Sequence, residues 1–185
     1  MSYSQDELLK TNLEKWYKKD NNKNLDLILN IINGNSNISL RILDWFVTNF
    51  SKENLTSYKI TKNDEVKRFN VYMDYKLKLK AYSKRRFDPF CRNERTNIPY
   101  KDGTHIQTTI GQLNFFKWVI ENNIIKYIED NHVQIEQDMN ERNSNSRKNK
   151  LINKATATRK KREELSTSAS KSIKKELVPV IINFN

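Results

Sequence analysis

Apolar residues in the first fifty positions recur at the three- and four-residue spacing of amphipathic helices. Ser4 and Glu7 form a capping-box pattern before the first apolar stripe, which predicts a helix over residues 4–19. A second apolar run ends at Gly34, a residue typical of the position after a helix. Ser39 is placed to cap a third helix. We therefore expect the N-terminal third of the chain to be helical.

Between residues 69 and 81 the apolar period changes from helical to alternating. Every odd position is apolar or aromatic and the even positions are mostly polar, which is typical of a half-buried strand. The even positions include Lys76, Lys78 and Lys80, so we expect this strand to turn a row of lysines to solvent. Because the run is longer than most strands, it is also expected to contain a bend or a break.

The second half of the chain predicts another strand and further helices. An alternating stretch over 106–110 fits a short strand partner. Thr109 and Gln112 then form a second capping-box pattern, at the head of an apolar helix. Residues 122–123 interrupt this pattern before it continues as a further helix.

These elements indicate the α+β class, with a helical N-terminal third, a small antiparallel sheet and C-terminal helices. Residues 1–137 are expected to form the globular domain. Apolar residues nearly vanish over 138–158, which leaves the composition of a disordered linker. The tail, 138–185, is therefore expected to be basic and largely disordered, with a short helix over 163–175 that forms on binding and a terminal strand over 177–182.

The chain of 185 residues has a formal charge of +12, from 34 Lys or Arg and 22 Asp or Glu. The charge is concentrated near the end, because residues 141–185 hold 12 cations against 4 acidic residues. A second cluster, over residues 76–95, begins within the predicted strand and continues after it. The candidate phosphate-binding residues in these two regions are Lys76, Lys78, Lys80, Lys84, Arg85, Arg86, Arg92, Arg95, Arg147, Lys148, Lys150, Arg159, Lys160, Lys161, Arg162, Lys171, Lys174 and Lys175.

Nucleic acid is the expected partner, with DNA favoured over RNA, because cations that neutralise phosphates release counterions and give affinity without sequence preference. Phe87 and Phe90 lie among the cations but are expected to be core anchors, which leaves phosphate contact without base stacking. The cluster over 159–162 also matches a nuclear-localisation signal. The alternative partner is an acidic protein, and a basic run that serves solubility alone is a further reading.

The sequence gives no strong sign of an enzyme, a cofactor or a metal. Its three glycines are not spaced for a nucleotide-binding loop, and its two histidines lie far apart. Glu65 and Lys67 form a Glu-x-Lys pattern that metal-dependent nucleases use, but such tripeptides are common in chains rich in these residues. Cys91 could be a reactive thiolate beside the arginines, though a small buried hydrophobe is favoured. No apolar stretch approaches the length that spans a bilayer, so a soluble, non-secreted protein is expected.

Several blocks of the sequence resemble a family of small basic proteins of nucleocytoplasmic large DNA viruses, the giant-virus group. The blocks are RILDWFVTNF (41–50), FNVYMDYK (69–76), LKAYSK (79–84), FDPFCR (87–92), TTIGQLNFFKW (108–118), RKKREELS (159–166) and VIINFN (180–185). The resemblance implies a viral protein that acts near a large DNA genome and is carried in the particle. It brings no catalytic role or site residues.

The hypothesis from the sequence is a viral, non-enzymatic DNA-binding protein that helps to condense, package or regulate the genome. Its expected location is the virion, and the host nucleus or a cytoplasmic viral factory. Two alternatives stay open: a virion structural or adaptor protein that binds acidic partners, and a nucleic-acid-processing enzyme.

Overall fold

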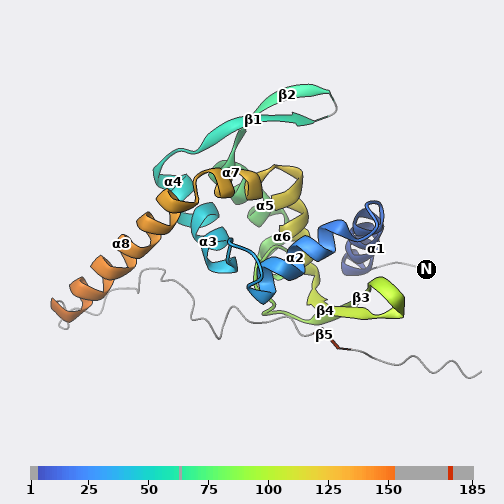
Figure 1. The fold of residues 1–185 in the computed structure, drawn as a ribbon. Helices are drawn as coiled ribbons and strands as arrows, with labels where there is room; N and C mark the ends of the chain where they lie inside the picture. Colours follow the sequence, from blue (N-terminus) through green and yellow to red (C-terminus); the bar gives the residue numbers. More distant parts are fainter. Residues whose placement is uncertain (1–3, 63, 153–174, 177–185) are drawn as a thin grey trace, which may run out of the picture.

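A computed structural model describes residues 4–62, 64–152 and 175–176, with the backbone alone described for 146–152 and 175–176. It has the predicted α+β class, with helices around two small antiparallel sheets (Figure 1). The helices are α1 (Gln5–Lys18), α2 (Lys23–Asn33), α3 (Leu40–Trp45), the π-helical turn η1 (Phe46–Phe50), α4 (Ser51–Glu53), α5 (Val71–Arg86), the 3-10 turn η2 (Lys101–Gly103), α6 (Ile110–Glu121), α7 (Ile124–Asp130) and α8 (His132–Ile152). The strands are β1 (Ser57–Lys62), β2 (Glu65–Asn70), β3 (Arg95–Pro99), β4 (His105–Thr109) and β5 (Lys175–Glu176).

The helix starts and stops that the sequence predicted are confirmed. Ser4 and Glu7 form the complete capping box of α1. Ser39 accepts a hydrogen bond from the amide of Ile42 at the start of α3, and Gly34 ends α2 in the left-handed conformation. Such side-chain caps satisfy amide groups that have no partner within the helix.

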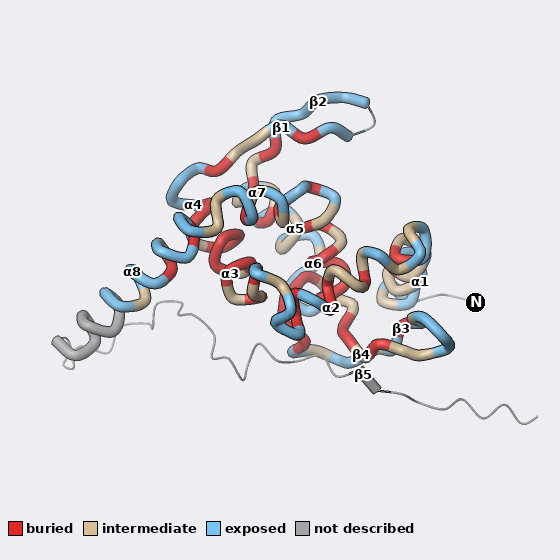
Figure 2. Tube along the Cα trace, in the orientation of Figure 1, coloured by how far each residue is buried: buried red, intermediate tan, exposed pale blue. Residues whose placement is uncertain are grey.

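The helix α6 lies at the centre of the molecule and is buried along almost its whole length (Figure 2). Thr109 caps it as predicted, by accepting a hydrogen bond from the amide of Gln112. The Gln112 side chain does not return to the cap, and instead donates to the carbonyl of Pro89, 2.9 Å away, and accepts from Thr108. The helix therefore uses its buried polar side chains to hold neighbouring segments.

The loop after α5 packs tightly against the first turn of α6. Phe87 and Phe90 are both 1% exposed, which confirms that they are core anchors. Asn114 donates to the carbonyl of Arg86, and the amide of Asp88 donates to the carbonyl of Gly111. A Cβ atom on Gly111 would lie 2.8 Å from the carbonyl oxygen of Arg85, so only glycine fits this contact.

The strand predicted between residues 69 and 81 is wrong beyond residue 70. Phe69 and Asn70 end β2, and the chain then forms α5, whose first turn is capped by the side chain of Asn70. The alternation misled because two large apolar residues of this helix, Met73 and Leu77, are 60% and 63% exposed. Val71, Tyr75 and Leu79 recur every four residues, as a helical stripe does, and Met73 and Leu77 fall between them, so the whole run reads as alternating.

The sheet is built from other strands than those expected. The predicted strand over 106–110 exists as β4, but its antiparallel partner is β3, with Ile98 opposite Ile106. Two residues of β5 pair with the other edge of β4. The remaining strands, β1 and β2, form a separate hairpin that extends away from the helices (Figure 1).

The disorder expected from residue 138 is wrong as far as residue 152, because α8 continues through this segment. Its first turns pack on the domain through Ile135 and Met139, which are 0% and 5% exposed. Asp138 accepts a hydrogen bond from the indole of Trp45 at 2.8 Å, which joins α8 to α3. Most of the helix beyond extends away from the body (Figure 1). The helix predicted over 163–175 and the strand predicted over 177–182 lie outside the described residues.

We expect Gly111→Ala to lower the free energy of unfolding by about 1–3 kcal/mol, because the added methyl group meets a backbone oxygen that cannot move freely. The direction of the stability change tests the close contact at Gly111, because a Gly to Ala substitution inside a helix otherwise stabilises the protein by about 0.8–1.0 kcal/mol. Urea unfolding monitored by tryptophan fluorescence measures the difference. An Ala variant as stable as the parent chain would contradict this packing.

Candidate nucleic-acid interface

The predicted row of three lysines does not exist, because a helix distributes these side chains around its axis. Lys76 and Lys80 lie four residues apart on the exposed side of α5. Lys78 is half-buried and lies on a different side of the helix. Within the described part of the chain, none of the three forms an ion pair. The structure thus leaves two of these lysines together on one surface.

Lys84 follows a break in the helix at Ser83, whose φ of 58° and ψ of 169° are not helical. A backbone conformation of this kind is unfavourable for any residue other than glycine, so the surrounding packing must impose it. The break redirects the chain before the two arginines that follow. Lys84 itself is exposed and has no carboxylate partner among the described residues.

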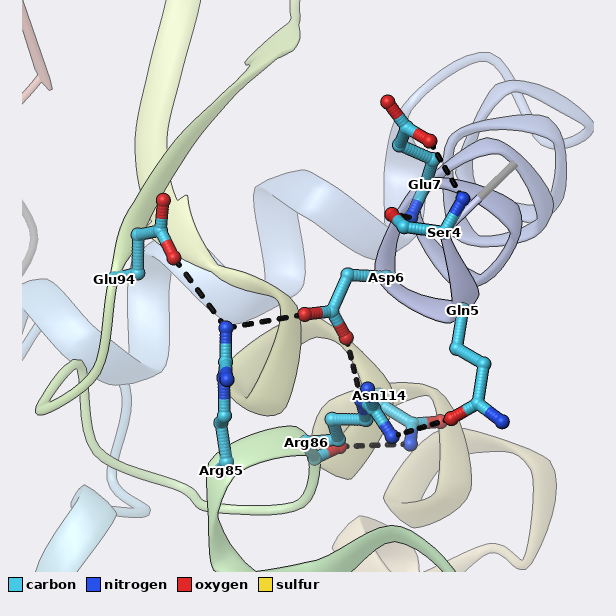
Figure 3. Close-up of polar contacts among 8 residues, drawn as sticks. All are labelled: Ser4, Gln5, Asp6, Glu7, Arg85, Arg86, Glu94 and Asn114. Carbon is cyan, nitrogen blue, oxygen red and sulfur yellow. Dashed lines mark hydrogen bonds and ion pairs between the residues drawn. The ribbon is translucent and has the colours of Figure 1, made fainter. Parts of the chain in front are cut away.

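The arginines of the predicted cluster are engaged within the protein. Arg86 donates to Asp6 and to Gln5, both in the first turn of α1 (Figure 3). Arg85 lies 3.2 Å from Asp6 and 3.5 Å from Glu94. These contacts join the start of α1 to the end of α5. A hollow of about 320 Å³ lies beside this junction. Its charged lining residues are three arginines and three acidic residues, whose formal charges cancel: Arg85, Arg86, Arg95, Asp6, Glu7 and Glu94.

Arg92 and Arg95 also have partners. The guanidinium of Arg92 donates two hydrogen bonds to the buried carboxylate of Asp88, and this bonding raises the pKa of Arg92 above its ordinary value. The two-bond geometry is the strong form of such a contact. Arg95 donates to the side chain of Gln107 on the neighbouring strand. Arg92 therefore holds the fold together, whereas the bond to a neutral amide leaves the charge of Arg95 in place, and only part of the predicted cluster is left to bind a ligand.

The predicted residues of the tail are placed only in part. Arg147, Lys148 and Lys150 belong to α8, and Lys175 lies in β5 opposite Ile106 on β4, but their side chains are not described. The remaining candidates lie outside the described residues: Arg159, Lys160, Lys161, Arg162, Lys171 and Lys174.

A basic element that sequence reasoning missed is the β1–β2 hairpin. Exposed cations occur on both strands, Lys59 and Lys62 on β1 and Lys67 and Arg68 on β2. Only part of the signal was present in the sequence. Tyr58 and Ile60 alternate with polar residues, and Asn and Asp at 63–64 are residues that tolerate the positive φ of a tight turn, but the second strand does not alternate, since Val66 and Phe69 lie three residues apart. Asp64 has the positive φ that such a turn requires.

The described residues contain no group of three His, Cys, Asp or Glu side chains placed to hold a metal ion. Glu65 and Lys67, the weak nuclease pattern, pair with each other at 2.7 Å on the exposed hairpin. Within the part of the chain described, no helix combines the length and the apolar character needed to cross a membrane.

Comparison with known proteins places the chain in a family. Residues 2–183 match the model of a family of unknown function, DUF7197. The chain belongs to this family. It is also 44% identical over 155 residues to a protein of Acanthamoeba polyphaga mimivirus named "Uncharacterized protein L507", a match covering 81% of this chain and 56% of that protein. The chain thus spans little more than half the length of this relative. No solved structure matches the chain.

The match to the mimivirus protein confirms the predicted giant-virus lineage. Since the family description names no activity, the chemistry of this DUF7197 protein has to be argued from its own residues.

Cys91 is buried in this DUF7197 protein, as favoured from the sequence, and is 7% exposed. Burial raises the pKa of its thiol, an effect that nearby Arg95 only partly offsets. His105, the partner considered for a reactive thiolate, lies on β4, and the described structure records no contact between the two residues. Cys91 is therefore a packing residue.

Because Cys91 is the only cysteine, alkylation reports its ionisation directly. We expect the folded chain to react slowly with iodoacetamide near neutral pH, with a rate that rises only above the ordinary thiol pKa. The same chain unfolded in urea is the control and reacts faster at each pH below the raised pKa. Rapid labelling of the folded chain at neutral pH would restore the reactive-thiolate hypothesis.

Proposed function

We propose that this protein is a non-enzymatic viral DNA-binding protein that contacts phosphates without sequence preference. The observation that carries the proposal is the distribution of charge. Of the formal +12, residues 141–185 contribute 12 cations against 4 acidic residues, so the excess lies mainly on α8 and beyond it. A segment with many cations along the chain can neutralise several phosphates of a duplex backbone at once.

Lysines of the folded domain support the same proposal. Lys76, Lys80 and Lys84 are exposed and form no ion pair with any described residue. An unpaired lysine can neutralise a phosphate without first breaking a contact within the protein. The neighbouring arginines lack this freedom, because Arg85 and Arg86 are held by Asp6.

The location that follows from this proposal is beside the viral genome. We place the protein in the virion, and during infection in the host nucleus or a cytoplasmic viral factory, where condensation, packaging or regulation of the genome takes place. The basic run over 159–162 supports import into a nucleus.

Titration of fluorescent duplex DNA with the full chain at several salt concentrations tests the proposal. We expect binding near physiological salt that weakens steeply as salt rises, and a loss of about one unit of the logarithmic salt slope per cation removed. Replacing the four residues 159–162 with Gln should therefore weaken binding and flatten the slope. A chain that does not bind duplex DNA, or whose binding ignores salt, would rule the proposal out.

The exposed apolar side of α5 favours a second candidate function, a virion adaptor that binds an acidic protein. Met73 and Leu77 are flanked by Lys76 and Lys80 around a shallow surface hollow of about 410 Å³. Large apolar side chains make few favourable contacts with the charged DNA backbone, whereas a protein interface combines an apolar centre with a charged rim. A partner with apolar and acidic residues would fit this surface.

Replacing both Met73 and Leu77 with Gln tests the adaptor function. We expect the variant to fold normally, because both side chains already contact solvent, and to be depleted from purified particles if this surface recruits the protein. Immunoblotting of particles against total infected-cell protein measures incorporation. Duplex affinity serves as the control, because this variant keeps all cations, and unchanged incorporation would exclude the adaptor surface.

A further inference from the structure

The β1–β2 hairpin is anchored firmly at its base although its outer part is exposed (Figure 2). The hydroxyl of Tyr58 donates to the carbonyl of Asn122 at 2.8 Å. Its ring stacks on Tyr127, with centroids 5.0 Å apart and planes 16° from parallel, while Phe69 packs against Trp118. Burial raises the pKa of the Tyr58 hydroxyl, as expected for a group that stays protonated as a donor. The hairpin is therefore a fixed projection.

The two faces of the hairpin differ in charge. The register places Lys62 opposite Glu65, and Lys67 pairs with Glu65 on the same face, so one carboxylate offsets part of the positive charge on this face. The other face carries Lys59 directly opposite Arg68 and contains no carboxylate. The hydroxyl of Ser57 accepts two hydrogen bonds from Arg68, which fixes the guanidinium without neutralising it.

Two cations directly opposite each other weaken a strand pair. Lysines on unpaired strand edges protect a sheet against aggregation, and this accounts for isolated cations on a hairpin. It accounts for one cation on each strand, since both strands are edges, but not for Lys59 directly opposite Arg68, because the two could protect both edges from staggered positions without this repulsion. An anionic ligand removes the repulsion and uses both charges.

The dimensions of the hairpin fit duplex DNA. Six residues per strand span about 20 Å, and two antiparallel strands lie about 4.8 Å apart. A major groove about 12 Å wide admits a two-stranded ribbon of this size. Thr61 and Val66, opposite each other on the face that carries Lys59 and Arg68, have no charge, so no carboxylate on this face is repelled by the groove.

We infer that the face of the hairpin bearing Lys59, Thr61, Val66 and Arg68 binds the major groove of duplex DNA, with Lys59 and Arg68 on phosphates at its rim. The inference rests on the proposed function, which it deepens by naming the contacting element. The cations outside the hairpin then bind the same duplex without entering a groove.

The test replaces Lys59 and Arg68 with Gln in the full chain and compares duplex binding with a matched variant, Lys15→Gln/Lys18→Gln. The control removes two exposed cations of α1, Lys15 and Lys18, neither of which forms an ion pair with any residue that the structure describes. We expect the hairpin variant to lose affinity by about tenfold or more and its salt slope to flatten by about two units. The α1 variant should stay within about twofold of the parent chain. Thermal unfolding confirms that both variants keep the fold.

Groove entry is tested with duplexes whose cytosines carry a bulky glucosyl group in the major groove. The parent chain should bind these more weakly than unmodified duplex, and the hairpin variant should bind both alike. The inference would be overturned if the parent chain bound the modified and unmodified duplexes equally. It would also be overturned if the hairpin and α1 variants lost the same amount of duplex affinity. Either result would leave the proposed DNA binding intact. A parent chain that binds no duplex would overturn both, and preference for single strands would overturn the groove assignment.

Discussion

The enclosure of α6 is the constraint on which the other elements depend. A helix buried on nearly every side must find partners for the polar groups that it carries inward, since an unpaired buried group costs about 1–3 kcal/mol. Each partner comes from a different element. Tyr17 of α1 donates to the carbonyl of Leu113, Asp74 of α5 accepts from the indole of Trp118, and Tyr58 of β1 donates to the carbonyl of Asn122. The positions of α1, α5 and β1 are thus fixed by polar contacts as well as by packing.

This arrangement determines which cations remain available to a ligand. The loop after α5 must approach α6 closely enough to require Gly111, and that approach brings Arg85 and Arg86 to the start of α1. Guanidinium groups make the planar, two-bond contacts that fasten such a junction, so the arginines serve the fold. Lysines on the outer side of α5 have no such role.

Capping residues and apolar periods predicted much of the fold, because both are local signals. The caps at Ser4, Ser39 and Thr109 were found from spacing alone. The α5 helix was missed because exposed Met73 and Leu77 turn a helical stripe into an alternating one, and tertiary context overrides such a pattern. Of the candidate site, sequence could identify the cations but not their partners, since the Arg86–Asp6 contact joins residues that are distant in the chain.

The net charge of a chain and the charge that its folded surface offers are different quantities. Between residues 76 and 95 the sequence shows eight cations, yet Arg85, Arg86 and Arg92 are paired with carboxylates of the protein. The hairpin shows the reverse, because the one carboxylate in its paired strands lies on one face, and the two cations of the other face have none beside them. Cations with no carboxylate beside them can therefore contribute more to phosphate binding than cations already paired within the protein.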